Sequence, residues 1–366
     1  MSGADIVVQV LADEGVDTIF GYSGGAILPT YDAVFRYNKL HGGDGRSPMP
    51  LIVPANEQGA GFMASGYARA SGKVGVVMVT SGPGATNTVT PVRDCMADSV
   101  PIVVICGQVP RSAVGTDAFQ EAPVSAIMGA VAKHVFLVTD PERLEATVRS
   151  AFELARTGRP GPVVVDIPKD VQNWQGAFMG GGALPLTGYR RRLQKVTGNR
   201  LSDEACERFF TMLAESDRPL IYAGGGVINA NAAKSMRRLA SEYGIPVTTT
   251  LMALGASDTL HPLALHMLGM HGLASANYAV EDCDFLIAVG ARFDDRVAGD
   301  PGRFAPNARH IAHFDVDSAE IGKVKRVDWH QVGLLERDLT ELLAYGRRID
   351  FNKNFDEWHA EIAHLK

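Results

Sequence analysis

Short apolar runs alternate with amphipathic segments along almost the whole chain, and this alternation limits the possible folds more than any other feature. Such a pattern is typical of βαβ units, whose right-handed crossovers place successive strands in one parallel sheet. We therefore expect an α/β protein with two doubly wound parallel sheets. The expected strands are Thr18–Phe20, Leu51–Val53, Val74–Val79, Ile102–Cys106, Val135–Val138, Val163–Ile167, Pro219–Ala223, Pro246–Thr249, Phe285–Val289 and His310–Phe314.

The alternation is interrupted between Gln172 and Asn199. This segment holds three consecutive glycines, a proline and three consecutive arginines with little periodicity, as linkers do. A polar tail with helix-like spacing of Phe355, Trp358 and Ile362 follows the second alternating run and suits a connector. The predicted organisation is a first domain over 1–171, a linker over 172–199, a second domain over 200–346 and a connector over 347–366.

The composition and charge of the chain exclude some classes of binding partner. Lys and Arg number 35 against 41 Asp and Glu, a net charge of -6, and the one basic run lies in the linker. Nucleic acid and anionic membranes are therefore not expected as partners. No apolar stretch is long enough to span a bilayer, and the N-terminus lacks a signal-peptide pattern. The four cysteines show no CxxC pair, which favours reduced, buried thiols in a cytoplasmic protein.

Two glycine-rich segments, 56–61 and 80–87, each follow an expected strand and open a helix. In a doubly wound domain both would lie at the carboxyl edge of one sheet, where ligands bind. Glu57 could simply complement a helix dipole. However, Gly59, Ala60 and Gly61 leave room for a ligand's ring, and the backbone amides after Pro83 can bind polar groups. We therefore interpret Glu57 as an acid facing a bound cofactor.

The second domain carries a nucleotide-type turn, Gly224-Gly225-Gly226, after an expected strand. Asn229 replaces the third glycine of a GxGxxG fingerprint, so standard NAD binding is not supported. Further turns at 269–272, 290–296 and 314–317 favour a dinucleotide held by its phosphates and ribose, although arginine and aspartate there could be solvated ion pairs. Histidines recur every five positions from His261, which scatters them around a helix, so no metal site is expected.

These segments together resemble the catalytic subunit of acetohydroxyacid synthase (acetolactate synthase), a thiamine diphosphate enzyme. The runs at 116–121 and 292–297 separate that family from most other thiamine diphosphate enzymes. The likeness extends over almost the whole chain, and the segments that carry it are Phe20–Pro29, Glu57–Ala60, Thr80–Asn87, Gly107–Pro110, Gly115–Glu121, Gly158–Pro162, Gly224–Gly226, Met270–Gly272 and Arg292–Val297.

The resemblance implies that Glu57 hydrogen-bonds the pyrimidine ring of thiamine diphosphate and favours its imino tautomer. It also implies a reaction: pyruvate is decarboxylated and the remaining two-carbon unit joins a second 2-keto acid, either pyruvate or 2-ketobutyrate. This is the first step of branched-chain amino-acid (valine and isoleucine) biosynthesis. The implied residues are Tyr22, Pro83 and Asn87 around the ring, Gly25 and Gln120 facing the reacting carbons, and Ala118, Phe119 and Arg296 at the second substrate.

The resemblance further implies FAD, which is structural and not redox-active in this family. Its implied contacts are Arg159, Gly224, Gly225, Gly226, Asn229, Gly269, Met270, His271, Gly272, Gly290, Arg292, Asp294, Asp315 and Asp317. Mg²⁺ would be held by a diphosphate-binding domain that the sequence to Lys366 does not include. The active site would form between subunits of a homodimer or tetramer, with a possible small regulatory subunit. The chain alone is thus expected to be inactive.

Two residues depart from the family pattern: Asn56 stands where histidine is usual, and Ser23 where proline is usual. The Gly43-Asp44-Gly45 triplet matches the core of the diphosphate motif by chance and is expected to be a loop. Two alternatives stay open. One is a related carboligase such as glyoxylate carboligase, which is expected to lack the acid at Glu57. The other is a non-catalytic FAD-binding assembly module.

Overall fold

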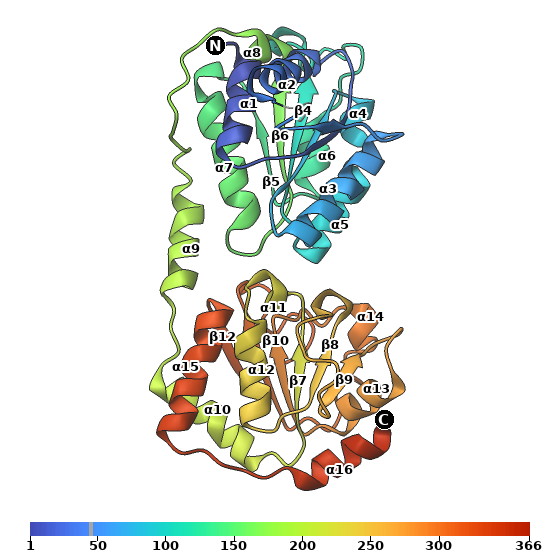
Figure 1. Ribbon diagram of the computed structural model, residues 1–366, viewed down its shortest axis with the longest axis vertical. Coiled ribbons are helices and arrows are strands. Elements are labelled where there is room, and N and C mark those ends of the chain that lie inside the picture. Colours follow the sequence, from blue (N-terminus) through green and yellow to red (C-terminus); the bar gives the residue numbers. More distant parts are fainter. Residues whose placement is uncertain (44–46) are drawn as a thin grey trace. The chain divides into compact units, whose positions relative to one another are not determined.

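The computed structural model describes residues 1–43 and 47–366, so Asp44 and Gly45 of the triplet lie outside the described residues. The chain divides into two compact units, 1–187 and 188–366. Each unit contains a six-stranded sheet flanked by helices (Figure 1). Every described pairing between the named strands is parallel. The predicted α/β class with two parallel sheets is therefore confirmed.

In the first unit the strand order is β2-β1-β3-β4-β6-β5. Helices α1, α2, α7 and α8 form one layer against the sheet, and α3 to α6 form the other. The strands are β1 Ile19–Tyr22, β2 Leu51–Ile52, β3 Gly75–Val79, β4 Ile102–Gln108, β5 His134–Leu137 and β6 Val163–Pro168. The helices are α1 Gly3–Asp13, α2 Leu28–His41, α3 Glu57–Ser71, α4 Pro83–Thr86, α5 Val89–Asp98, α6 Val124–Gly129, α7 Leu144–Arg156 and α8 Lys169–Asn173, with 3₁₀ turns at Arg111–Ala113 and Pro141–Arg143.

In the second unit the strand order is β12-β11-β10-β7-β8-β9. The strands are β7 Pro219–Ala223, β8 Val247–Thr249, β9 Ala264–Met267, β10 Phe285–Val289, β11 His310–Asp315 and β12 Trp329–Val332. The helices are α10 Asp203–Glu215, α11 Gly226–Asn229, α12 Ala233–Glu242, α13 Ala274–Asp282, α14 Asp295–Ala298, α15 Leu335–Arg348 and α16 Asp356–Leu365, with a 3₁₀ turn at Leu251–Ala253. Helix α9, Thr187–Gly198, begins at the boundary between the units.

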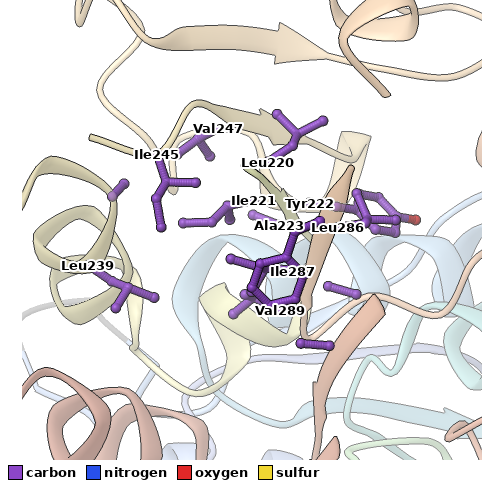
Figure 2. Close-up of a cluster of buried hydrophobic side chains, with 14 of the residues drawn as sticks. Leu220, Ile221, Tyr222, Ala223, Leu239, Ile245, Val247, Leu286, Ile287 and Val289 are labelled. Atoms are coloured by element: carbon purple, nitrogen blue, oxygen red, sulfur yellow. The ribbon is translucent and has the colours of Figure 1, made fainter. Parts of the chain in front are cut away.

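The central strands of both sheets are continuous apolar runs because helices cover both of their faces. Strands β3, β4, β7 and β10 are buried along their whole length. Figure 2 shows the core of the second unit, where side chains of β7 and β10 meet Leu239 of α12 and Ile245. Burial on this scale supplies the main free energy of folding. All four cysteines are buried and unpaired, as predicted.

Several elements were absent from the sequence prediction, among them β9, β12 and α9. Strands β9 and β12 are short edge strands interrupted by polar residues, His266 in β9 and His330 and Gln331 in β12, so they lack an apolar run. Helix α9 lies in the segment predicted as a linker without periodicity, and it buries no residue, so it has no apolar stripe to detect. The helical spacing of the tail is confirmed by α16, in which Trp358 is buried and donates to the Pro219 carbonyl at 3.0 Å. The connector role of the tail stays a prediction.

Candidate functional site

The strand order of the first sheet reverses between β1 and β3. The chain runs outward from β1 to β2 and then returns to β3 on the other side of β1. Open α/β sheets bind ligands outside the carboxyl ends of the strands at such a switch point. Tyr22 ends β1, Glu57 begins the helix after β2, and segment 80–87 follows β3. The predicted segments therefore share the edge that favours ligand binding.

Glu57 is the first residue of α3, and only 9% of it is exposed. The preceding Asn56 is the N-cap, whose side-chain oxygen accepts a hydrogen bond from the Gly59 backbone N–H at 2.8 Å. A cap of this kind fixes the start of a helix, and the helix dipole favours a carboxylate in the first turn. The fold thus holds the Glu57 side chain in a defined place at the sheet edge.

Asn87 connects the two predicted segments. Its Nδ2 donates a hydrogen bond to Glu57 Oε2 at 2.9 Å. No donor among the described residues bonds to the other oxygen, Oε1, so that oxygen is available to a ligand. Oε1 lies toward Gly84, where an added Cβ would sit 3.5 Å from it. The residue beside the available oxygen therefore presents backbone rather than a side chain.

Thr80 connects the glycine turn after β1, which contains Gly24, to the turn after β3, which contains Gly84. Its Oγ1 accepts a hydrogen bond from the Ala26 backbone N–H at 3.2 Å. A Cβ added at Gly84 would lie 2.7 Å from Thr80 Cγ2, and one added at Gly24 would lie 2.5 Å from it. Both contacts are too short for any side chain, so the two turns approach as closely as they do only with glycine at both positions.

Three further predicted residues lie at this edge with accessible surfaces. Tyr22 is 39% exposed, and Pro83 and Gly25 are exposed as well. Nothing lies within 4 Å of a Cβ built on Gly25. Among the described residues none of the three forms a hydrogen bond with Glu57. Their arrangement around the ligand is therefore still a prediction.

The loop after β4 brings Gln120 to the same edge. Gln120 has a left-handed backbone, φ +58°, and a Cβ added at Gly82 would lie 2.4 Å from its carbonyl oxygen. The Glu121 carboxylate closes the loop on itself, since it accepts from the backbone N–H groups of Gly115 and, at 3.1 Å, Ala118. The Gly115 hydrogen bond is the main cause that lowers the pKa of Glu121. Phe119 in the same loop is 88% exposed.

Tyr31 is a buried residue at this edge that the sequence did not reveal. Its hydroxyl donates to the Met78 carbonyl at 3.0 Å. Burial first, and the charge of Glu57 second, raise the pKa of the Tyr31 hydroxyl well above its usual range. Tyr31 follows the ordinary pattern of α2, which carries no mark of a site, so sequence alone offered no signal for it.

The second sheet has its own switch point, between β7 and β10. The triple-glycine turn after β7 contacts the backbone after β10: Gly226 N–H donates to the Gly290 carbonyl at 3.0 Å. A Cβ at Gly224 would lie 2.2 Å from the Gly290 oxygen, and one at Gly226 would lie 2.7 Å from the Gly290 Cα. Gly290 itself has φ +59°. The contact therefore requires glycine on both sides.

Two other turns of the second unit, 269–272 and 290–296, meet near Arg296. The Met270 N–H donates to the Arg296 carbonyl at 2.9 Å, which joins the 269–272 turn to the loop after β10. Asp294 caps α14 by accepting from the Arg296 N–H at 3.1 Å and lies 3.6 Å from the Arg292 guanidinium. His271 and Gly272 belong to the same 269–272 turn, and Gly272 N–H donates to Gly269 at 2.9 Å.

The remaining residues predicted for FAD lie in three places. Asn229 ends α11 in the second unit, and Asp315 ends β11, where its Oδ1 accepts from the Asp317 N–H at 2.8 Å. Arg159 belongs to the first unit, where its Nε donates to Ser99 Oγ at 2.9 Å. Most of these residues therefore lie in segments that follow strands of the second sheet, whereas Arg159 lies in the other unit.

In the described ranges, 1–43 and 47–366, no three His, Cys, Asp or Glu side chains are placed to hold a metal ion. Nor does any helix there have the length and apolar character needed to cross a membrane.

Two family models match the chain. The model of the thiamine pyrophosphate enzyme N-terminal TPP binding domain matches residues 1–127, and that of the thiamine pyrophosphate enzyme central domain matches residues 206–342. The first range contains Glu57, Asn87 and Gln120, and the second contains the glycine contact at Gly226 and Gly290. The residues at each switch point thus lie within a matched range, whereas Arg159 lies outside both.

Curated proteins that are similar over almost the whole chain are acetolactate synthases. The "probable acetolactate synthase large subunit" of Methanocaldococcus jannaschii is 45% identical over 100% of this chain and 59% of its own length. The acetolactate synthase large subunit of Corynebacterium glutamicum is 46% identical over 94% of this chain and 52% of its own. The mitochondrial acetolactate synthase catalytic subunit of Saccharomyces cerevisiae is 43% identical over 99% and 52%. The chain thus spans about half the length of these curated relatives.

Proposed function

Because the chain belongs to the acetolactate synthase family of thiamine pyrophosphate enzymes, we propose that it supplies the pyrimidine-binding and FAD-binding parts of an acetolactate synthase. The reaction would decarboxylate pyruvate and add the two-carbon unit to a second pyruvate or to 2-ketobutyrate. The observation that carries this proposal is Glu57, held by Asn87 through Oε2 with Oε1 available at a glycine-lined edge.

The residues at this edge fit a thiamine pyrimidine ring. Glu57 Oε1 would share a proton with a ring nitrogen, and its near-complete burial would strengthen that hydrogen bond. Asn87 keeps the carboxylate turned toward the ring, while Gly84 leaves space for it. Tyr22 and Pro83 would contact the ring, and Gly25 and Gln120 would face the substrate. When bound, thiamine diphosphate supplies the carbon centre that stabilises the negative charge left by decarboxylation.

The second switch point fits the dinucleotide FAD. The triple-glycine turn has no side chains, so a phosphate could approach its backbone closely, and the Gly225 N–H would be the donor because the Gly224 and Gly226 N–H groups already donate to the Val289 and Gly290 carbonyls. Arg292 would pair with phosphate, and Asp315 and Asp317 would accept hydrogen bonds from ribose hydroxyls. We propose a structural role for FAD. We also propose that Arg296 binds the carboxylate of the second substrate and that Ala118 and Phe119 contact that substrate. A forked guanidinium suits such a carboxylate.

The proposal includes components beyond these residues. Mg²⁺ and the cofactor's diphosphate would be bound by a further domain, in a homodimer or tetramer with the active site between subunits, with or without a small regulatory subunit. We propose a cytoplasmic location, since four buried, unpaired cysteines suit a reducing compartment.

Reconstitution tests the proposal. The chain is mixed with a separately expressed diphosphate-binding domain from a relative, thiamine diphosphate, Mg²⁺, FAD and pyruvate, and acetolactate is measured. We expect acetolactate with the native chain and little with Glu57→Gln. Glu204→Gln is the matched control, because Glu204 also lies in the first turn of a helix, α10, but is exposed. Absence of acetolactate at every mixing ratio would favour a non-catalytic FAD-binding module.

A further inference from the structure

A buried carboxyl group on β6 has no role in the site described above. Asp166 is 1% exposed. Its Oδ2 accepts a hydrogen bond from Gln108 Nε2 at 3.0 Å, whereas its Oδ1 has no partner among the described residues. Burial is the main cause that raises the pKa of Asp166 to about 7. Burying a carboxyl group inside a sheet opposes folding. We therefore ask what the hydrogen bond between Asp166 and Gln108 contributes.

That contact lies at the base of the loop that carries Gln120. Gln108 ends β4, and its side-chain Oε1 accepts from the Val109 N–H at 2.9 Å. Its Nε2 donates both to Asp166 and, at 3.3 Å, to the Ala122 carbonyl. One amide side chain therefore touches the first residue of the 109–122 loop and the last, and closes the loop at its base.

The orientation of this amide depends on Asp166. An amide side chain can turn over and exchange its oxygen and nitrogen. An acceptor facing the Nε2 group permits one orientation, in which the second N–H reaches Ala122. Without that acceptor the two orientations differ less in energy, and the hydrogen bond to Ala122 is lost in one of them.

Other contacts hold other parts of the 109–122 loop, so the contribution of Gln108 is confined to the base of the loop. Arg111 binds the Asp170 carboxylate at 2.7 Å near the start of the loop, and Glu121 folds its middle. The Gln120 carbonyl packs on Gly82. The return of the loop at Ala122, two residues from Gln120, is held by Gln108 and by the Val124 N–H at 2.8 Å.

We propose that Asp166 is a positioning residue, which orients the Gln108 amide and thereby keeps the 109–122 loop closed with Gln120 against Gly82. The inference rests on the proposed function only in that Gln120 is taken to face the substrate. Asp166 itself is buried in the sheet, so we propose that it acts through Gln108 rather than on a ligand.

Hydrogen–deuterium exchange of the full chain tests the proposal without any cofactor. Asp166→Leu, which removes the acceptor and keeps the branched four-atom skeleton of the side chain, should raise amide exchange across 109–122 about tenfold, since one buried hydrogen bond is lost. Asp166→Asn, whose side-chain oxygen still accepts, should leave this exchange near the native rate. Ser150→Ala is the control: it removes a buried hydrogen bond to the Leu184 N–H, remote from the loop in sequence, and should leave the loop unchanged.

Should Asp166→Leu fail to fold, Gln108→Met tests the same link, because it keeps the length of the side chain and removes its donors. Native exchange across 109–122 in Asp166→Leu or Gln108→Met overturns the proposal, as does Asp166→Asn exchange equal to that of Asp166→Leu. If the exchange pattern is as expected but the reconstituted system forms no acetolactate, the result counts against the proposed function and leaves the role of Asp166 standing.

Discussion

Asn87 Nδ2 donates a hydrogen bond to Glu57 Oε2 across 2.9 Å, and this bond joins the turn after β3 to the helix after β2. The acid is therefore fixed by one oxygen while the other remains available at the switch point of the sheet. A carboxylate that only complemented the helix dipole would not need a partner from another strand. This pairing is the observation that favours a ligand site over an ordinary helix start.

Glu57→Gln should lower the rate of acetolactate formation by roughly 10²-fold or more, because the amide cannot exchange a proton with the ring. The free energy of unfolding should fall by about 1 kcal/mol or less, the usual worth of an acid in a first turn. Steady-state kinetics of the reconstituted enzyme and urea unfolding measure the two effects. An active but slightly less stable variant would mean that the acid serves the helix alone.

Gly84→Ala should destabilise the first unit by roughly 1–3 kcal/mol, because the new methyl would lie 2.7 Å from Thr80 Cγ2. It should also weaken thiamine diphosphate binding, since the methyl lies beside Glu57 Oε1. Gly66→Ala in α3 is the control: nothing lies within 4 Å of its Cβ, and alanine should stabilise that helix by roughly 0.5–1 kcal/mol. Equal unfolding midpoints for the two variants would contradict this packing.

Gly226→Ala should release FAD and destabilise the second unit by roughly 1–3 kcal/mol, because its Cβ would lie 2.7 Å from the Gly290 Cα. Flavin absorbance after gel filtration and thermal unfolding measure both effects. Gly198→Ala at the end of α9 has open space around its Cβ and should change neither. Full flavin retention in Gly226→Ala would argue against FAD at this turn.

Asp166 predicts a pH dependence of stability. Its pKa is about 7 in the folded protein against a usual 3.8, so the folded state binds this proton more tightly. Its contribution is fully present below pH 3.8 and is lost as pH rises through 7, by about 1.4 kcal/mol per pH unit at most. Asp166→Asn should remove this slope. Urea unfolding of the native protein and of Asp166→Asn between pH 5 and 8 gives the free energy of unfolding of each. The contributions of other titrating groups, such as Asp338, cancel in the difference between the two. Parallel curves would contradict the assignment.

The sequence was sufficient to predict the features that depend on local pattern. Buried parallel strands such as β4 appear as continuous apolar runs, and glycine turns after strands mark the switch points. The segments containing Glu57 and Asn87 could be assigned to one edge because parallel strands end together.

Features that depend on tertiary contacts could not be predicted. The Gln108–Asp166 pair joins residues 58 positions apart on neighbouring strands, and neither residue has a local signature. Tyr31 looks like any apolar position of α2, and the solvated helix α9 has no stripe that packing would impose. Edge strands β9 and β12 were missed because sheet pairing, rather than apolar composition, defines them.

The most direct test is a crystal structure of the chain assembled with a diphosphate-binding domain, thiamine diphosphate and Mg²⁺. We expect Glu57 Oε1 within about 2.6–3.2 Å of a pyrimidine ring nitrogen, with Asn87 still bonded to Oε2. A Glu57 carboxylate turned to bulk solvent, or separated from the ring by neighbouring side chains, would contradict the assignment.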